Sequence, residues 1–186
     1  DKFSNEWWRN FNVKTKNFAK QKIFTDSLSN EILDKLKQAV DRVIRNIINY
    51  KIIEGLRVSI DGKFSPNNLQ LIYNNVPSNH ESIEDWCKTI FHQKKFAIIQ
   101  NGCQHLDLEL KKNIAILFAP LIENFGIPPQ GLEVTLFFGN YGYTPLGFHR
   151  DPEGNKVTHL HLGPGRKDIY TIPPKVYEEE LSAITH

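Results

Sequence analysis

Cysteine is scarce in this sequence, and its scarcity excludes several kinds of protein. The chain of 186 residues contains two cysteines, Cys87 and Cys103, and neither belongs to a metal-ligand pattern. This composition excludes a disulfide-rich secreted domain and a cysteine zinc site. No long apolar run or secretory leader precedes the two cysteines, so we expect a cytoplasmic protein with no membrane partner.

The chain also lacks a large net charge of either sign, and it contains no methionine. The formal net charge is +2, which favours no polyanionic partner, and we therefore expect no binding of nucleic acid. The apolar fraction of 40% and the aromatic fraction of 11% are ordinary for a globular protein with a sizeable core. Because the chain has no methionine and begins at Asp1, we expect either a processed chain or a piece of a longer protein.

The first 130 residues show the patterns of helices mixed with short strands. Between about residues 30 and 50, apolar residues recur every three or four positions, which predicts an amphipathic helix with Asp26 or Ser29 as its N-cap. Trp7 and Trp8 precede this helix, and we interpret them as packing residues that tie the N-terminal segment to the body of the protein.

Further elements follow from changes of period. Alternating residues at 56–60, an Asp61-Gly62 turn and the run 69–73 predict a β-hairpin. The residues from Ser82 to Asp85 resemble the capped start of a helix. Residues 96–100 are predicted to form a buried strand, and residues 106–125 a helix that ends at Gly126. Three scattered histidines in this part lack acidic or cysteine partners at ligand spacing, so we interpret them as surface or core-edge residues: His80, His92 and His105.

After Pro128-Pro129 the pattern becomes one of strands. Three segments separated by glycine- and proline-rich turns predict strands at 132–138, 156–162 and 166–172. Helices followed by a run of short strands predict an α+β chain in which helices flank a barrel or sandwich.

The segment around His149-Arg150-Asp151 is the strongest candidate for a functional site. Side chains two residues apart point to the same face of an extended chain, so the imidazole and the carboxylate can converge on one metal ion. Two histidines and one carboxylate leave three positions of an octahedral metal open, and this arrangement is typical of non-haem Fe(II) oxygenases. His149 and Asp151 provide two of these three ligands.

Residues 96–180 resemble the JmjC and cupin-like Fe(II)/2-oxoglutarate-dependent oxygenases. In addition to His149-Arg150-Asp151, the resemblance rests on the run from Leu160 to Lys167 with its Gly163-Pro164-Gly165 turn, and on the run from Ile169 to Pro174. It implies a double-stranded β-helix core, of the cupin-like or jelly-roll type, with flanking N-terminal helices. It also implies one domain over 1–186, with a helical and mixed part at 1–130 and β-helix strands at 131–186 that we expect to be incomplete at the C-terminal end.

The resemblance also implies roles for basic residues after the turn. Lys167 best matches the family's cation that pairs with the distal carboxylate of 2-oxoglutarate, and Arg166 is one residue away on the opposite face. A solvent-facing hairpin turn is the alternative interpretation of the same residues. Thr158, with His159 and His161, forms a further polar cluster that can line the barrel and contact substrate or cosubstrate, although one of the two histidines is an alternative metal ligand.

The third metal ligand is the least determined part of the predicted site. His186 is the only histidine after Pro173-Pro174, and we predict that the ligand is either His186 or a residue outside this sequence. The predicted activity is oxidation, by hydroxylation, of a peptide, protein or small-molecule substrate with Fe(II) and 2-oxoglutarate, and a homodimer is compatible with it. The alternatives are a cupin-type binding protein without oxygenase activity and a cupin isomerase that uses His159 or His161 as acid–base groups.

Overall fold

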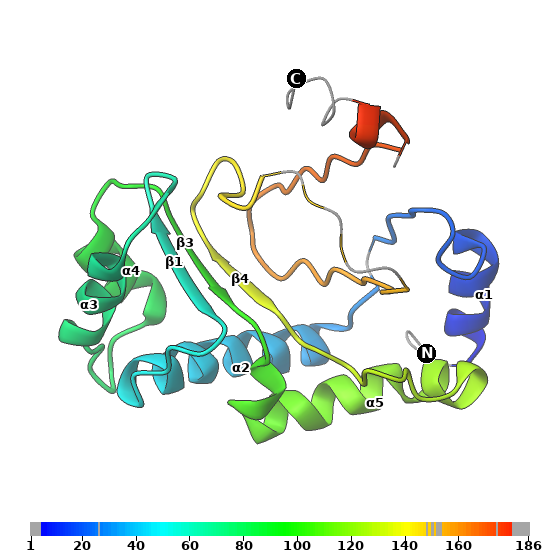
Figure 1. Ribbon diagram of the computed structural model, residues 1–186. Coiled ribbons are helices and arrows are strands. Elements are labelled where there is room, and N and C mark those ends of the chain that lie inside the picture. Colours follow the sequence, from blue (N-terminus) through cyan, green and yellow to red (C-terminus); the bar gives the residue numbers. More distant parts are fainter. Residues whose placement is uncertain are drawn as a thin grey trace. The chain divides into compact units, whose positions relative to one another are not determined.

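The computed structural model describes residues 5–25, 27–147, 149, 151, 154–173 and 175–179. The chain divides into two compact units, Asp1–Lys156 and Val157–His186. The first unit contains all the helices and strands named below, and Figure 1 shows their order. The sequence-based prediction of a single domain over 1–186 stays a prediction.

The first unit combines helices with one small antiparallel sheet, so the predicted α+β class is correct. The helices are α1 (Asn5–Thr15), α2 (Asn30–Asn49), α3 (Pro66–Asn74), α4 (Ile83–Phe91) and α5 (Leu108–Phe125), with a short 3-10 helix η1 (Cys103–His105) before α5. The strands are β1 (Leu56–Ile60), β2 (Lys63–Phe64), β3 (Phe96–Gln100) and β4 (Leu136–Gly139), in the sheet order β2-β1-β3-β4. Within the part of the chain that the structure describes, none of the helices has both the length and the apolar composition required to span a bilayer.

Helix α2 forms where the apolar periodicity predicted it. The Ser29 side chain accepts a hydrogen bond from the Ile32 amide and caps the helix, while Asp26, the other predicted cap, lies outside the described residues. One face of α2 is fully buried through Leu36, Ala39, Val43, Ile44, Ile47 and Ile48. Each large aliphatic side chain buried in this way contributes about 1.5–3 kcal/mol, so packing rather than capping stabilises most of the helix.

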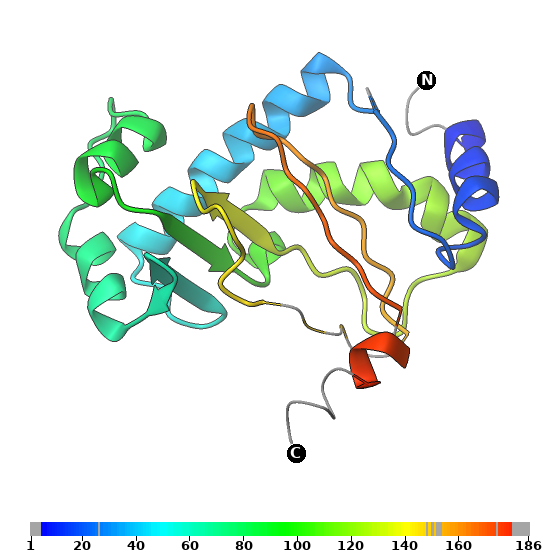
Figure 2. The same ribbon diagram turned by 90° about the horizontal axis from the view of Figure 1, so that it is seen from above.

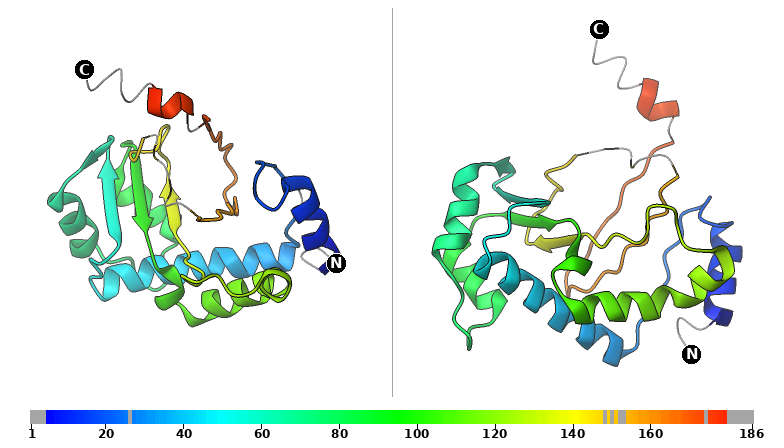
Figure 3. Two further views of the ribbon diagram at one scale, coloured as in Figure 1. Left: turned by 45° about the vertical axis from the view of Figure 1, so that its right-hand side comes forward. Right: turned by 60° about the horizontal axis from the view of Figure 1, so that its bottom comes forward.

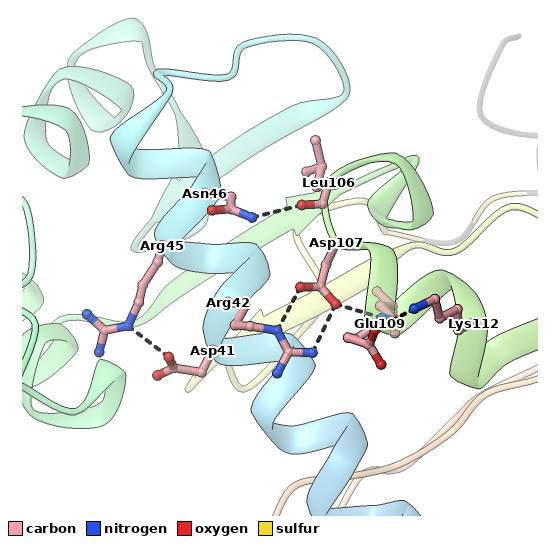
Figure 4. Close-up of polar contacts among 9 residues, drawn as sticks. Asp41, Arg42, Arg45, Asn46, Leu106, Asp107, Glu109 and Lys112 are labelled. Carbon is pink, nitrogen blue, oxygen red and sulfur yellow. Dashed lines mark hydrogen bonds and ion pairs between the residues drawn. The ribbon is translucent and has the colours of Figure 1, made fainter.

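Helices α2 and α5 pack against each other through a polar cluster as well as through apolar side chains (Figures 1, 2 and 4). Asp107, the N-cap of α5, accepts a hydrogen bond from the Leu110 amide at 2.6 Å. The same carboxylate accepts two hydrogen bonds from Arg42 of α2, at 2.7 and 3.0 Å. Asn46 of α2 donates to the Leu106 carbonyl at 2.8 Å, so consecutive turns of α2 hold the start of α5.

The two faces of the sheet have different neighbours. Phe91 of α4 stacks on Phe96 of β3 with a centroid distance of 4.0 Å, which places α4 against the face that also carries Ile98 and Val58. Figures 1 and 3 show α3 and α4 together on one side of the strands. The opposite face carries Ser59, Ala97 and Gly139, which are cross-strand neighbours.

The aromatic residues before α2 pack as predicted. The Trp8 side chain is fully buried, and its indole N–H donates to the Leu117 carbonyl of α5 at 3.0 Å. Trp7 stacks on Phe11 with a centroid distance of 5.4 Å. These contacts fasten α1 to α5, which confirms the interpretation of this tryptophan pair as packing residues.

Three predictions of secondary structure were wrong. Residues 69–73 belong to α3 and not to a hairpin strand, because Ser65 caps a helix whose first residue is Pro66. The predicted turn at Asp61-Gly62 exists, but it joins β1 to the two-residue strand β2. The segments 156–162 and 166–172 contain no strand. An extended chain becomes a strand only when its backbone forms hydrogen bonds with a neighbouring strand, and no described segment pairs with these two in that way.

Other predicted elements are confirmed with small shifts of boundary. The strand at 96–100 is β3, and the predicted strand at 132–138 overlaps β4. Ser82 caps α4 by accepting a hydrogen bond from the Asp85 amide at 3.0 Å. Gly126 ends α5 with a φ of 80°, a conformation that glycine adopts without steric cost.

Candidate functional site: the His149–Asp151 pair

The segment that carries His149 and Asp151 leaves the sheet at the end of β4. Asn140, the next residue, accepts a hydrogen bond from the Phe96 amide at 2.8 Å and donates one to the Lys94 carbonyl at 3.2 Å. Gly139 allows this close approach, because a Cβ atom there would overlap the Phe96 carbonyl oxygen. The start of the segment is therefore held against the first residue of β3.

The far end of the same segment is also fastened to the first unit. The Lys156 ammonium lies 5.5 Å from the centroid of the Phe18 ring and 5.8 Å from that of Phe125. A cation placed between two aromatic faces is attracted by both ring quadrupoles. The chain from Asn140 to Lys156 is thus anchored at both ends, and the candidate metal ligands lie between the anchors.

A turn precedes His149 and orients its ring. The Gly147 amide donates to the Thr144 carbonyl at 3.1 Å, and Gly147 has a φ of 64°, which a residue with a Cβ atom rarely adopts. The Gly147 carbonyl lies 3.1 Å from Nδ1 of His149. A carbonyl can only accept, so this contact places the ring proton on Nδ1 and leaves the lone pair on Nε2.

His149 and Asp151 converge, as their spacing predicted. Nε2 of His149 lies 3.9 Å from Oδ1 of Asp151, and the two side chains are 52% and 54% exposed. With Nδ1 protonated, a lone pair and a carboxylate oxygen face each other, and neither atom can donate to the other. A cation that accepts both electron pairs, or a second proton on the imidazole, resolves this conflict.

The donor set fits two positions of a divalent metal ion. Adjacent ligands of an octahedral metal lie roughly 3 Å apart when each bond is about 2.1 Å, so these two atoms have to approach by about 1 Å. Half-exposed side chains at the surface can make this movement by rotation. Metal-bound histidines typically donate their second ring N–H to a backbone carbonyl, and Nδ1 of His149 makes such a contact with the Gly147 carbonyl.

A complete metal site is not assembled from the residues that the structure describes. In those residues, no group of three histidine, cysteine, aspartate or glutamate side chains is arranged to hold a metal ion. His186, the predicted third ligand, lies outside the described residues. His80, His92 and His105 are exposed, as the interpretation of surface histidines predicted.

The predicted cosubstrate residues belong to the second unit. Arg166 donates to Asp168 at 2.8 Å, and its side chain is 86% exposed. The Lys167 side chain is exposed as a whole, yet the protein around its ammonium lowers its pKa, because partial burial disfavours the charged form. Thr158 is half-buried.

The polar cluster before the glycine turn shows alternating exposure. The side chains of Thr158, Leu160 and Leu162 are half-buried, whereas those of His159 and His161 are exposed. This period of two is that of an extended backbone, and it places the two histidines on one face. Nε2 of His161 lies 2.6 Å from the Gly165 carbonyl, so a hydrogen bond closes the turn between them.

The sequence analysis missed a pocket at the end of the sheet. The pocket has a volume of about 370 Å³ and is lined by Ser59, Asp61, Gly62, Lys95, Phe96, Tyr141, Gly142, Tyr143 and Pro145. Two signals pointed to it: a serine inside the apolar strand at 56–60, and the Tyr141-Gly142-Tyr143 run just before the candidate ligands. Its three contributing segments are distant in sequence, so only the folded chain shows that they meet.

Comparison of the chain with protein-family models, with curated proteins and with solved structures gives no match. The functional argument therefore rests on the residues and on their geometry.

Proposed function

We propose that this protein is an Fe(II)- and 2-oxoglutarate-dependent oxygenase that hydroxylates a peptide, a protein or a small molecule. The observation that carries the proposal is the His149–Asp151 pair, in which a lone pair on Nε2 faces a carboxylate oxygen 3.9 Å away while Nδ1 is held by the Gly147 carbonyl. A divalent cation between these atoms satisfies both. When bound, Fe(II) and 2-oxoglutarate would supply the chemistry with O2 as the oxidant: one oxygen atom would go into succinate as the keto acid loses CO2, and the other into the hydroxyl group formed from a C–H bond of the substrate.

The residues of the chain would position these partners. His149 and Asp151 hold the metal, and a third ligand, His186 or a residue outside this sequence, completes the facial set. Lys167 binds the distal carboxylate of 2-oxoglutarate. The lowered pKa of its amine supports this role, since a partly dehydrated ammonium gains most from a carboxylate partner.

Arg166 and Thr158 would have secondary roles at the cosubstrate. Arg166 pairs with Asp168, so a cosubstrate carboxylate that binds Arg166 would have to replace that partner. Thr158 is half-buried on the face opposite His159 and His161, and its hydroxyl is suited to a hydrogen bond with a carboxylate oxygen.

The proposal includes a double-stranded β-helix as the core of the complete protein. Strand β4 is the last strand in the order β2-β1-β3-β4, so among the described strands its outer edge has no partner. An open edge is able to receive a further strand, and the alternating exposure at 158–162 shows a segment with the required extended period.

The decisive activity test is oxygen-dependent, substrate-stimulated formation of succinate from 2-oxoglutarate. The expected result is succinate formation that requires Fe(II) and is lost in Asp151→Ala but kept in Asp34→Ala, a variant of an exposed aspartate on α2. Metal binding without succinate formation under any substrate pool would instead assign a cupin-type binding protein. A metal-independent conversion that is lost in His159→Ala or His161→Ala would assign an isomerase.

A further inference from the structure

Helix α1 and the loop after it carry an excess of positive charge. Between Trp7 and Thr25 the chain has five cations and no acidic residue: Arg9, Lys14, Lys16, Lys20 and Lys22. All five of these side chains are exposed. The formal net charge of +2 conceals this local excess, because acidic residues elsewhere in the chain offset it. A local field of one sign attracts partners of the opposite sign.

These five cations have no acidic neighbour to neutralise them. None of them forms an ion pair with a residue that the structure describes. Lysines on other helices of the first unit do have such partners, since Lys88 pairs with Glu84 at 3.0 Å and Lys112 with Glu109 at 2.8 Å. The charge near α1 is therefore available to an external anion.

The loop that carries three of the lysines is fastened to α1 at both ends. At its start, the Lys20 amide donates to the Thr15 carbonyl at 2.8 Å. At its end, the Phe24 ring stacks on Phe11 of α1 with a centroid distance of 5.1 Å. Figures 1 and 3 show this loop beside the helix. The loop lysines are thus presented next to those of α1.

Two aliphatic side chains are exposed among these lysines. Val13 of α1 is 77% exposed and precedes Lys14, while Ile23 of the loop is 90% exposed and follows Lys22. Such side chains gain free energy when they leave water for an apolar phase. The charged and aliphatic residues together form what we call the N-terminal basic surface: Val13, Lys14, Lys16, Lys20, Lys22 and Ile23.

The exposed residues favour an anionic lipid surface over a nucleic acid. Single-stranded nucleic acids bind through bases that stack on aromatic rings. Here the rings are engaged within the protein, because Phe11 packs on Phe18 and Phe24, and the Lys156 ammonium lies over Phe18. Exposed aliphatic side chains beside lysines are instead typical of surfaces that lie at the boundary between lipid headgroups and acyl chains.

We propose that the N-terminal basic surface binds the anionic face of a phospholipid membrane as a peripheral contact. The lysines pair with phosphate and carboxylate groups of the lipid headgroups, and Val13 and Ile23 enter the boundary with the acyl chains. The expectation of no membrane partner rested on the absence of a long apolar run, whereas a surface contact needs only exposed side chains. The inference is independent of the proposed function, because neither His149 nor Asp151 takes part.

The experiment is sedimentation of the full chain with vesicles of phosphatidylcholine and, separately, with vesicles that contain about 30% phosphatidylserine. We expect binding to the phosphatidylserine vesicles alone, and we expect it to weaken as salt is added. Lys16→Gln/Lys20→Gln should weaken this binding about 25-fold, since each lysine near such a surface contributes about fivefold.

The matched control is Lys88→Gln/Lys112→Gln, which removes the same charge from α4 and α5. Its affinity for the phosphatidylserine vesicles should change less than about threefold, because surface charges act only within a Debye length. The substituted lysines are all exposed, so each variant should fold, which circular dichroism checks.

Ile23→Ser tests the apolar part of the contact and separates lipid from nucleic acid. It should weaken binding to the phosphatidylserine vesicles about threefold or more. Binding of a single-stranded oligothymidine should be weaker than vesicle binding and should not change in Ile23→Ser, since that probe offers no apolar phase.

Three results would overturn the inference. The first is no binding to the phosphatidylserine vesicles, or equal binding to both kinds of vesicle. The second is an equal loss of binding in Lys16→Gln/Lys20→Gln and in the control. The third is tighter binding of oligothymidine than of the vesicles together with wild-type vesicle affinity in Ile23→Ser, which would assign the surface to nucleic acid.

Discussion

Asp107 stabilises the first unit in two ways, as the N-cap of α5 and as the partner of Arg42 in α2. Its replacement by alanine should therefore destabilise the fold strongly. Its carboxylate is 8% exposed, caps α5 through the Leu110 amide and accepts two hydrogen bonds from Arg42 (Figure 4). Loss of an N-cap costs about 0.5–2 kcal/mol, and loss of hydrogen bonds to a charged group about 1.5–3 kcal/mol. The Arg42 side chain is 40% exposed and can be rehydrated, which reduces the second value.

We therefore expect Asp107→Ala to lower the free energy of unfolding by about 2–4 kcal/mol. Asp107→Asn keeps an oxygen for the cap and loses the ion pair, so it should lower that free energy by roughly half as much. The assay is urea denaturation of both variants, of Arg42→Ala and of the double variant Arg42→Ala/Asp107→Asn. The control is Lys112→Ala, which removes the exposed pair with Glu109 and should cost under about 0.5 kcal/mol.

The dependence of this effect on pH has a defined sign. Hydrogen bonds from Arg42 lower the pKa of Asp107 in the folded protein below the ordinary value of 3.8 for this side chain. The stabilisation from Asp107 is therefore fully present above that value and is lost as the pH falls through the lower folded-state pKa. The difference in stability between the wild type and Asp107→Asn should shrink on acidification below about pH 4. A coupling energy near zero between Arg42 and Asp107, or a difference that grows in acid, would refute this reasoning.

Three further predictions concern the site and the two thiols. Lys167→Ala should raise the 2-oxoglutarate requirement roughly tenfold to a hundredfold and leave metal affinity unchanged, whereas the same loss in Arg166→Ala alone would assign the anchor to Arg166. His186→Ala should weaken Fe(II) binding if His186 is the third ligand, and unchanged affinity would place that ligand elsewhere. Burial raises the pKa of Cys87 to about 12 and that of Cys103 to about 11. Neither thiol should therefore react with a thiol reagent at pH 8 until the protein is unfolded. Rapid labelling of the folded protein would contradict this prediction.

Local patterns were sufficient to predict most helices of the first unit. The periodicity of α2 and the cap residues Ser29 and Ser82 are contained within a few turns of chain, and the structure confirms them. The hairpin prediction failed because residues 69–73 are apolar at nearly every position, so their period alone does not distinguish a strand from a helix. The Ser65-Pro66 pair, a cap followed by proline at the first helical position, was the decisive local signal.

Features that depend on long-range contacts could not be predicted in the same way. His149 and Asp151 are two residues apart, so their convergence follows from backbone geometry. The pocket is different, because Ser59, Lys95 and Tyr141 meet only through the pairing of β1, β3 and β4. The expected strands at 156–162 and 166–172 have the right alternation, but strand formation requires partners that a sequence pattern does not specify.

The measurement that tests the central proposal most directly is an anaerobic Fe(II) titration of the wild type, His149→Ala, Asp151→Ala and the control His80→Ala. His80 is exposed and distant in sequence from the pair, so its loss should leave the affinity unchanged. The proposal predicts saturable binding in the wild type and in the control, and affinity lower by orders of magnitude in both site variants, while circular dichroism shows that all four proteins remain folded. Wild-type affinity in Asp151→Ala would contradict it and would remove His149 and Asp151 as a metal site.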